Sequence, residues 1–293
     1  MRVAFLHYTP KKHPPANFYY YGWGSALKGH EVVEKDCVYS SLEESDGDFD
    51  LCFVTPGFVK YKDHLYKKRS KTKYVLITDE DMHQPVEGLK CTAEYYDYVF
   101  VHSEINYLCL QVLGVRNVRN ILPCYNPDIF YPVKADKKFD VAFLGQFDQR
   151  FDIVGLTRHL ICTGLETSSD FKHFIGRGFY ASQANEIYND SRIALDLPIM
   201  TVVGGRSFCI GATTATLMLP GTKKTGLWND IFIPGEDYIQ FSRAEELKDI
   251  LRASLERPDE CLRIRKNMNK KVQKHTYAER FKEILNVAFE GNV

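Results

Sequence analysis

Short apolar runs recur along the first half of the chain at intervals that leave room for a helix between them. They fall at residues 1–8, 49–55, 74–79 and 98–102, with one more strand expected after a helix that ends at Gly29. Runs that are apolar at nearly every position are typical of strands covered on both faces of a parallel sheet. Strands that alternate with helices predict an α/β domain with right-handed crossovers.

The second half of the chain repeats this pattern. Its apolar runs fall at 139–144, 171–175, 193–197 and 217–220, with helical segments at 151–163 and 181–190. Ser242 to Glu245 reads as a capping box that opens a further helix. The tetrapeptide Val-Ala-Phe-Leu begins at Val3 and again at Val141, near the start of each half. We therefore expect an α/β protein with two nucleotide-binding-like lobes and a cleft between them.

A proline-rich stretch divides the two halves. Pro123, Pro127 and Pro132 suit an extended connection, and we place the first lobe at residues 1–133 and the second at 134–275. Apolar residues recur at helical spacing near the C-terminus, namely Tyr277, Phe281, Ile284, Leu285 and Phe289. Residues 276–293 are therefore predicted to form a final helix that packs one face on the body of the protein.

Composition narrows the class of protein. The 293 residues carry 38 basic and 38 acidic side chains, so any polyanionic partner must be met by a local patch. The eight cysteines lack metal-ligand spacing and are expected to be reduced thiols. No apolar run is long enough to span a bilayer, and the N-terminus has no signal-peptide pattern. We expect a soluble cytoplasmic protein without a membrane span.

Glycine and arginine follow several strands of the second half, at the sheet edge where open parallel sheets bind ligands. The residues are Gly145, Gln146 and Arg150 after the run at 139–144, Gly176, Arg177 and Phe179 after the run at 171–175, and Arg206 at an expected helix start. Glycine lets a ligand approach the backbone, and arginine matches phosphate geometry. Each segment alone can equally be an ordinary turn, but three together favour a phosphate-bearing ligand.

Acidic residues crowd one strand end of the first half. The run at 74–79 ends in Asp79, and Glu80, Asp81 and His83 follow it. Asp79 is a candidate general base. Asp79 and Asp81 also have the Asp-x-Asp form that binds a divalent ion such as Mg²⁺ or Mn²⁺ beside a diphosphate. The alternative is a solvated acidic turn that caps the next helix.

Basic and aromatic residues cluster in two further segments of the first half. Seven positive charges lie between Lys60 and Lys73, including Lys68 and Arg69, and they suit either a solvated helix face or a contact with nucleic-acid backbone. Lys11 and Lys12 lie in the loop after the first strand. A later aromatic group that contains Tyr21 and Trp23 suits either stacking on a sugar or base, or a helix core.

Several of these segments occur in an order that resembles a known family. They are Thr78-Asp79, the linker from Pro123 to Pro132, Asp140 to Phe147 with Arg150, Tyr188 to Leu197, Arg206-Ser207-Phe208, Phe232 to Glu236 and His275 to Arg280. This set is similar to the GT-B glycosyltransferases, and within them to the spore-maturation-protein (CgeB-type) group. The similarity spans about residues 70 to 285.

The resemblance implies two Rossmann-like lobes, with a nucleotide sugar, expected to be a UDP-sugar, in the second lobe, an acceptor in the first, and a last helix that crosses back to the first lobe. Asp79 would be the catalytic residue, and no metal or cofactor would be required beyond the donor. Donor contacts would come from the three glycine and arginine turns together with Ser207 and Glu236. Acceptor contacts would come from Lys11, Lys12, Tyr21, Trp23, Lys68 and Arg69.

A more distant similarity is to phage DNA β-glucosyltransferase, which has Thr-Asp at the same strand end and an arginine that matches Arg206. It gives the lysine-rich segment a role in binding DNA with a hydroxymethylated base, whereas a glycan is the alternative acceptor. If a phage encodes the chain, the expected location is the host cytoplasm.

One position departs from the family pattern. The family has a glutamate that holds the nucleotide ribose three residues after the arginine, whereas this chain has Cys209. A thiol cannot accept ribose hydroxyl hydrogen bonds as a carboxylate does. Either another acid such as Glu236 substitutes, or the donor is held differently, or the protein is a catalytically degenerate GT-B module that binds nucleotide sugar or nucleic acid.

Overall fold

The structure is a computed structural model that describes residues 1–7, 17–36, 48–55, 71–78, 90, 93–147, 153–179, 181–198, 204–221 and 226–290. Side chains are described throughout these ranges except at 7, 17–21, 36, 153–154 and 226. The chain forms two compact units. Unit 1 contains Met1–Leu122 and Tyr277–Val293, and unit 2 contains Pro123–Thr276.

Unit 1 is built on a six-stranded parallel sheet with the order β2-β1-β3-β4-β5-β6. Its strands are β1 (Arg2–His7), β2 (Glu31–Asp36), β3 (Leu51–Thr55), β4 (Lys73–Thr78), β5 (Tyr98–Val101) and β6 (Val118–Asn120). β1 pairs with β2 on one side and with β3 on the other. Five of these strands match apolar runs or strands read from the sequence. The edge strand β6 was missed because three residues carry too little pattern.

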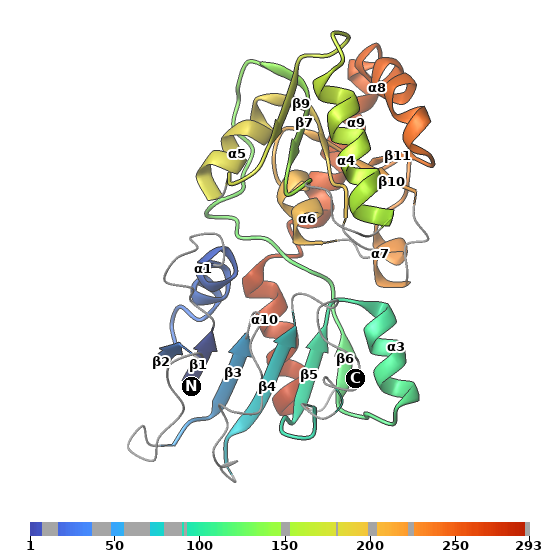
Figure 1. Ribbon diagram of the computed structural model, residues 1–293. Coiled ribbons are helices and arrows are strands. Elements are labelled where there is room, and N and C mark those ends of the chain that lie inside the picture. The colour runs from blue at the N-terminus through green and yellow to red at the C-terminus, as the bar shows by residue number, and fades with distance from the viewer. Residues whose placement is uncertain are drawn as a thin grey trace. The chain divides into compact units, whose positions relative to one another are not determined.

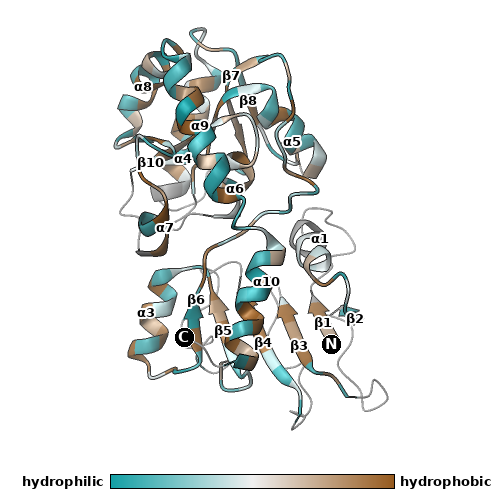
Figure 2. Cartoon of the chain, turned by 180° about the vertical axis from the view of Figure 1, so that it is seen from behind, coloured by the Kyte–Doolittle hydropathy of each residue, from teal (hydrophilic) through white to brown (hydrophobic). Residues whose placement is uncertain are grey.

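Helices cover both faces of this sheet, which explains why its strands are apolar at nearly every position. On one face, Leu110 of α3 (Glu104–Val112) belongs to a core cluster that contains Val99 of β5 and Val118 of β6. On the other face, Phe53 of β3 contacts Phe281 of α10 (Tyr277–Leu285), with ring centroids 5.4 Å apart. In Figure 2 the strands β1, β3 and β5 are mostly hydrophobic, whereas α10 has hydrophilic and hydrophobic bands.

The C-terminal helix crosses back to unit 1, as the resemblance implied. Figure 1 shows α10 beside the strands of unit 1, and its first residue, Tyr277, packs against Trp23 of α1 (Asn17–Ala26) with centroids 4.9 Å apart. Phe281 and Ile284 of α10 are also buried. The prediction was wrong for Phe289, which lies on the π-helical turn η5 (Asn286–Glu290) and is 48% exposed.

Unit 2 is built on a five-stranded parallel sheet with the order β11-β10-β9-β7-β8. Its strands are β7 (Phe139–Leu144), β8 (His173–Gly176), β9 (Ser191–Leu195), β10 (Thr216–Pro220) and β11 (Ile239–Phe241). Its helices are α4 (Ile153–Glu166), α5 (Ala181–Asn189), α6 (Gly205–Gly211), α7 (Gly226–Ile231), α8 (Leu247–Leu255) and α9 (Pro258–Val272). Figure 1 shows the same arrangement of sheet and flanking helices in both units, so the α/β prediction with two Rossmann-like lobes is confirmed.

The helix α8 begins differently from the prediction. A 3₁₀ turn, η4 (Ala244–Glu246), precedes it, and the capping box involves Glu246 instead of Glu245. A carboxylate oxygen of Glu246 accepts hydrogen bonds from the backbone N–H groups of Ser242 at 3.2 Å and of Arg243 at 3.3 Å. The box lies one residue later because the tighter turn starts at Ala244 and places Glu246 at its third position.

The chain passes from unit 1 to unit 2 at Pro123, before the boundary placed at Val133. The backbone N–H of Tyr131 donates to Asn185 Oδ1 at 3.2 Å, and that of Val133 donates to Asn189 Oδ1 at 2.9 Å. These bonds attach the proline-rich connection to α5, so the connection belongs to unit 2. Among the described helices, none has the length and apolar character that a membrane crossing requires.

Candidate functional site

The ends of β7 and β8 form the base of the candidate site in unit 2. The two strands are parallel neighbours, and the backbone N–H of Gly145, which follows β7, donates to the carbonyl of Gly176 at 2.9 Å. Two of the three predicted glycine and arginine turns therefore lie side by side. Gln146 and Arg177, the next residues along each chain segment, are both exposed.

The third turn joins this edge through Arg206. Its guanidinium lies so close to Gly145 that a Cβ atom built there would be 2.9 Å from Arg206 Nη2 and 3.0 Å from Phe143 Cζ. The guanidinium also lies over the Phe143 ring, 5.3 Å from its centroid. A side chain at position 145 would displace the arginine, so glycine here allows the contact. The structure thus brings Gly145, Gly176 and Arg206 together.

A buried carboxylate holds Arg206 in this position. Asp196, directly after β9 and 2% exposed, accepts a hydrogen bond from Arg206 Nη1 at 3.0 Å. Its second oxygen accepts from the Ser207 hydroxyl at 2.6 Å. A carboxylate with two donors is stable when buried, and the pair fixes the direction of the guanidinium. The sequence motifs did not single out Asp196, because only the fold brings it beside Arg206.

Ser207 has a different role from the predicted donor contact. It is fully buried, and its hydroxyl hydrogen is engaged by Asp196. The side chain therefore orients the carboxylate that orients Arg206, and it offers no surface to a ligand.

A second arginine, Arg158 of α4, holds the turn after β7 through hydrogen bonds to backbone carbonyls. It is 5% exposed, its Nη1 donates to the Gln146 carbonyl at 2.7 Å, and its Nη2 donates to the Leu197 carbonyl. These bonds tie the ends of β7 and β9 together. Sequence reasoning missed Arg158 because a single arginine within an apolar helical segment carries no recognisable signal.

Aromatic rings line the β8 side of the site. A Cβ atom at Gly176 would lie 2.7 Å from Phe179 Cε2, so the glycine allows this ring to fold over the strand end. Phe179 packs on Phe174 in a T-shaped contact at 5.2 Å. The Arg177 guanidinium lies 5.8 Å from the centroid of the Phe147 ring. Arg177 and Phe179 therefore border the edge at which Arg206 lies.

Cys209, at the position of the expected glutamate, faces the interior of unit 2. It is 3% exposed, and burial raises the pKa of its thiol, so the group is neutral. Tyr188, Asp196 and Arg206 are its electrostatic neighbours. A neutral buried thiol in this setting supplies no carboxylate to a ribose.

Glu236 lies on the segment between α7 and β11. It is exposed, and its carbonyl accepts a hydrogen bond from Asn267 Nδ2 of α9 at 3.0 Å, while the preceding Gly235 carbonyl accepts from Arg263 at 2.7 Å. Its backbone is thus anchored along α9, whereas Arg206 is anchored by Asp196 at the end of β9. These bonds concern the backbone, so the role of Glu236 as a substitute for the missing glutamate stays a prediction.

Trp23 is the acceptor candidate whose side chain the structure describes, and it has no exposed surface. It packs on Phe53 and Tyr277, which confirms the helix-core alternative and corrects the stacking role. Tyr21 lies on α1 with its side chain outside the described residues. The remaining predicted positions lie outside the described ranges, namely Lys11, Lys12, Lys68, Arg69, Asp79, Asp81 and Arg150.

β4 ends at Thr78, so Asp79 follows a strand end as the sequence indicated. Within the described ranges, no group of three or more His, Cys, Asp or Glu side chains is placed to hold a metal ion.

Solved structures of several glycosyltransferases share this fold. A sucrose-phosphate synthase from Thermosynechococcus elongatus matches with a TM-score of 0.69 at 14% identity, over 100% of both chains. Anabaena HepE in complex with UDP-glucose matches with a TM-score of 0.62 at 11% identity, over 98% of this chain and 99% of HepE. S. aureus TarM matches with a TM-score of 0.60 at 10% identity, over 81% of this chain and 55% of TarM. At such low identity these similarities show the fold, which is that of the GT-B glycosyltransferases.

Sequence comparison gives the family. No curated protein matches the chain closely enough to count as a relative. The family model described as glycosyl transferase-like matches residues 132–286, which is more than half of the chain and includes every residue of the strand-end site described above. The chain therefore belongs to the glycosyl transferase-like family.

Proposed function

We propose that the protein transfers a sugar from a nucleoside-diphosphate donor to a hydroxyl acceptor, and that unit 2 binds the donor diphosphate. The observation that carries this proposal is the Arg206 guanidinium, fixed by Asp196 against the glycine turn at Gly145. Arginine pairs with phosphate through two parallel N–H groups, and glycine lets phosphate oxygens reach the backbone. Arg177 adds a second exposed cation at the neighbouring strand end.

The same groups would assist the chemistry of transfer. When the sugar–phosphate bond breaks, negative charge develops on the departing diphosphate, and fixed donors that face this charge lower the barrier. Asp79 would accept the proton of the acceptor hydroxyl if the reaction inverts the anomeric centre, and would position the acceptor if it retains. The support for Asp79 is its place directly after β4 and the family resemblance. Asp79 and Asp81 would hold a metal if the enzyme needs one.

Uridine diphosphate is the nucleotide we favour. HepE has been solved with UDP-glucose, and TarM with UDP, α-GlcNAc-glycerol and fondaparinux. We further propose that the chain belongs to the CgeB-type group, on the ordered motifs from Thr78 to Arg280. The acceptor proposed from the lysine-rich segment 60–73 is a hydroxymethylated base in DNA, and the alternative is a glycan.

Calorimetry with UDP tests donor binding. Replacing Arg206 with alanine removes about one charge-assisted hydrogen-bonding group, so we expect binding to weaken by about tenfold or more. Arg192→Ala is the matched control, because Arg192 is an exposed arginine of unit 2 that contacts Asp140 at the surface. Equal affinity of UDP for the Arg206→Ala variant and the wild-type protein would refute the diphosphate site.

A transfer assay tests the acceptor and the catalytic residue. Purified protein with UDP-glucose should modify hydroxymethylcytosine DNA, and modification of a glycan alone would reject DNA as the acceptor. Asp79→Ala should abolish transfer while UDP binding stays nearly intact. Full residual transfer by this variant would exclude the proposed role of Asp79.

Cys209 favours a second candidate function, a binding module without turnover. The buried neutral thiol supplies no ribose contact, so the donor would be held by the diphosphate alone. UDP binding in calorimetry together with no hydrolysis or transfer of UDP-glucose would support this second function.

A further inference from the structure

A hollow of about 410 Å³ lies in unit 2 between the connecting segment and α5. Its lining includes Asp128, Tyr131 and Val133 from the connection, and Asn185, Glu186 and Asp190 from α5 and its C-terminus. Its size falls within the range of about 300–1,000 Å³ that is typical of small-molecule sites. The residues that hold Arg206 do not line it, so the proposed diphosphate site leaves this hollow unexplained.

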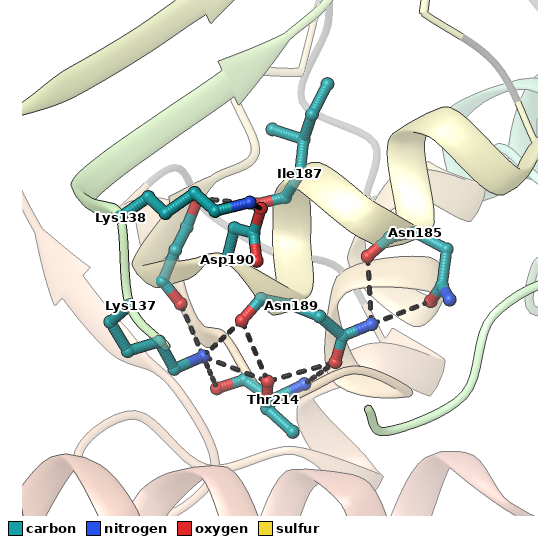
Figure 3. A network of polar contacts seen from close by, with 8 residues as sticks. Lys137, Lys138, Asn185, Ile187, Asn189, Asp190 and Thr214 are labelled. Atoms are coloured by element: carbon teal, nitrogen blue, oxygen red, sulfur yellow. Dashed lines mark hydrogen bonds and ion pairs between the residues drawn. The ribbon is translucent and has the colours of Figure 1, made fainter. Parts of the chain in front are cut away.

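Hydrogen bonds to Asn189 fix the two walls of the hollow relative to each other. Asn189 Nδ2 donates to the Tyr131 carbonyl at 3.1 Å, and its Oδ1 accepts from the Val133 N–H at 2.9 Å. The same oxygen accepts from the backbone N–H of Thr214 at 3.0 Å. Figure 3 shows the Asn189 side chain between Asn185 and Thr214. An amide that is satisfied on both ends holds the connection at a set distance from α5.

Lys137 anchors the far end of the same connection. Its Nζ donates to the carbonyls of Asn189 and Ser191 at 2.8 Å each, and to the carbonyl and the hydroxyl of Thr214 at 2.9 Å each (Figure 3). Beside it, Lys138 pairs with Asp190 at 2.7 Å. The hollow is therefore bounded by backbone that is hydrogen-bonded on both sides, and it is pre-formed.

Asn185 presents an unused donor to this hollow. The residue is 5% exposed, and its Oδ1 accepts from the Tyr131 N–H at 3.2 Å and from Asn189 Nδ2 at 3.0 Å. Both partners are donors, so they determine which end of the amide is oxygen. The amide nitrogen then has no hydrogen-bond partner among the described residues, and Figure 3 shows it at the outer end of the side chain, away from the network. The nitrogen is not one of the buried polar atoms that lack a partner, so it reaches solvent and is available to a ligand that enters the hollow.

The remaining lining combines acceptors with apolar surface. Glu186 is exposed at one wall, and Tyr131, which is 49% exposed, presents a large ring at the other with Val133 beside it. Carboxylates accept hydrogen bonds from hydroxyl groups and repel phosphates, so the lining disfavours nucleotides and nucleic acid. An aromatic ring with a polar edge suits the apolar face of a sugar ring. We propose that this hollow is a saccharide-binding site, separate from the donor diphosphate site.

Saturation-transfer NMR with the full chain tests this site, using maltotriose and diacetylchitobiose as neutral probes and spermidine as a cationic one. We expect at least one saccharide to bind and Tyr131→Ala to weaken it by about tenfold, the loss of one aromatic contact. Glu186→Gln should weaken binding of the same saccharide. The matched control is Tyr95→Ala, since Tyr95 lies in unit 1 and is 45% exposed. UDP titrations on the same variants should match the wild-type protein.

Two results would overturn the proposal. One is that neither saccharide binds at millimolar concentration. This includes the result that spermidine alone binds and that Glu186→Gln abolishes spermidine binding. The other is that saccharide binding is equal in Tyr131→Ala, Glu186→Gln and the control. Failure of the diphosphate site is distinguishable, because Arg206→Ala would then leave UDP binding unchanged while the saccharide result stands by itself.

Discussion

Two glycines of α1 give a sharp test of how the C-terminal helix packs on unit 1. A Cβ atom at Gly22 would clash with Cε2 and Cζ of the Tyr277 ring, whereas one at Gly24 would meet nothing within 4 Å. Tyr277 is 1% exposed, and its ring packs edge-on against Trp23 at 4.9 Å. The ring therefore has no open space into which it can swing, and Gly22→Ala must displace α10 or distort α1.

The magnitude follows from the two positions. Overpacking a buried contact costs about 1–3 kcal/mol, and a contact this short lies at the upper end of that range. Replacing glycine by alanine inside a helix where nothing is in the way stabilises by about 0.5–1 kcal/mol. We therefore expect Gly22→Ala to lower the free energy of unfolding by about 2–2.5 kcal/mol, which is the overpacking cost less the helix gain, and Gly24→Ala to raise it by about 0.5–1 kcal/mol. The two variants share a helix and a substitution, so helix propensity cancels in the comparison.

Urea denaturation followed by tryptophan fluorescence measures both variants. Trp23 lies in this contact and reports it directly. A variant that combines Gly22→Ala with Tyr277→Leu completes a double-mutant cycle. Once the ring is replaced by a smaller side chain, Gly22→Ala should lower the free energy of unfolding by less than about 1 kcal/mol. If Gly22→Ala and Gly24→Ala have equal stability, α10 does not pack on α1 as the structure shows.

Three further changes address unit 2. Gly145→Ala should push Arg206 away from the strand end and weaken UDP binding by about tenfold, as measured by calorimetry. Gly164 is a helical glycine at which an added Cβ would meet nothing within 4 Å, so Gly164→Ala should leave UDP binding unchanged. Asp196→Asn removes a negative charge near the proposed anion, yet it should also weaken UDP binding by about tenfold, because Arg206 loses its charged partner. Tighter UDP binding would contradict the positioning role of Asp196. Burial lowers the pKa of Lys137 from 10.5 to about 8, so the unfolded chain binds more protons than the folded one between these pH values. The free energy of unfolding of the wild-type protein, relative to that of Lys137→Met, should therefore rise across this interval and stay level below pH 8. Urea titrations at a series of pH values measure it.

The fold was largely predictable because buried parallel strands leave a strong apolar signal. The run at 139–144 has the same bounds as β7, and the helix at 181–190 matches α5 to within one residue. The edge strands β6 and β11 have three residues each, and runs so short do not stand out from turns. The capping box predicted at Ser242 to Glu245 was wrong by one residue, because a single 3₁₀ turn places Glu246 at the capping position.

The candidate site was predictable in composition and not in its contacts. Gly145, Gly176 and Arg206 were found because glycine and arginine after strands have a recognisable chemistry. Asp196 and Arg158 were missed because the partner of each, Arg206 and the Gln146 carbonyl, belongs to the next element or turn, 10 and 12 residues away. No periodicity in the sequence links residues at these spacings, and only the folded structure brings them together. Glu236 as a replacement for the missing glutamate stays a prediction, because the hydrogen bond from Asn267 fixes its backbone and not its carboxylate.

The pairing of Arg206 with Asp196 bears on what kind of anion site this is. Under the proposed function, the negative charge of Asp196 offsets part of the attraction between Arg206 and the diphosphate. The hydrogen bond that Asp196 accepts also fixes the guanidinium toward the ligand, and we expect this second effect to be the larger one. Binding substrate and transition state equally strongly does not raise the rate of the chemical step, however, and a product diphosphate that is held too tightly leaves slowly. A guanidinium already engaged by a carboxylate at 3.0 Å gives up some attraction and keeps a fixed direction. Fixed donors act where charge develops during bond breaking, so this arrangement favours transfer over simple retention of the nucleotide.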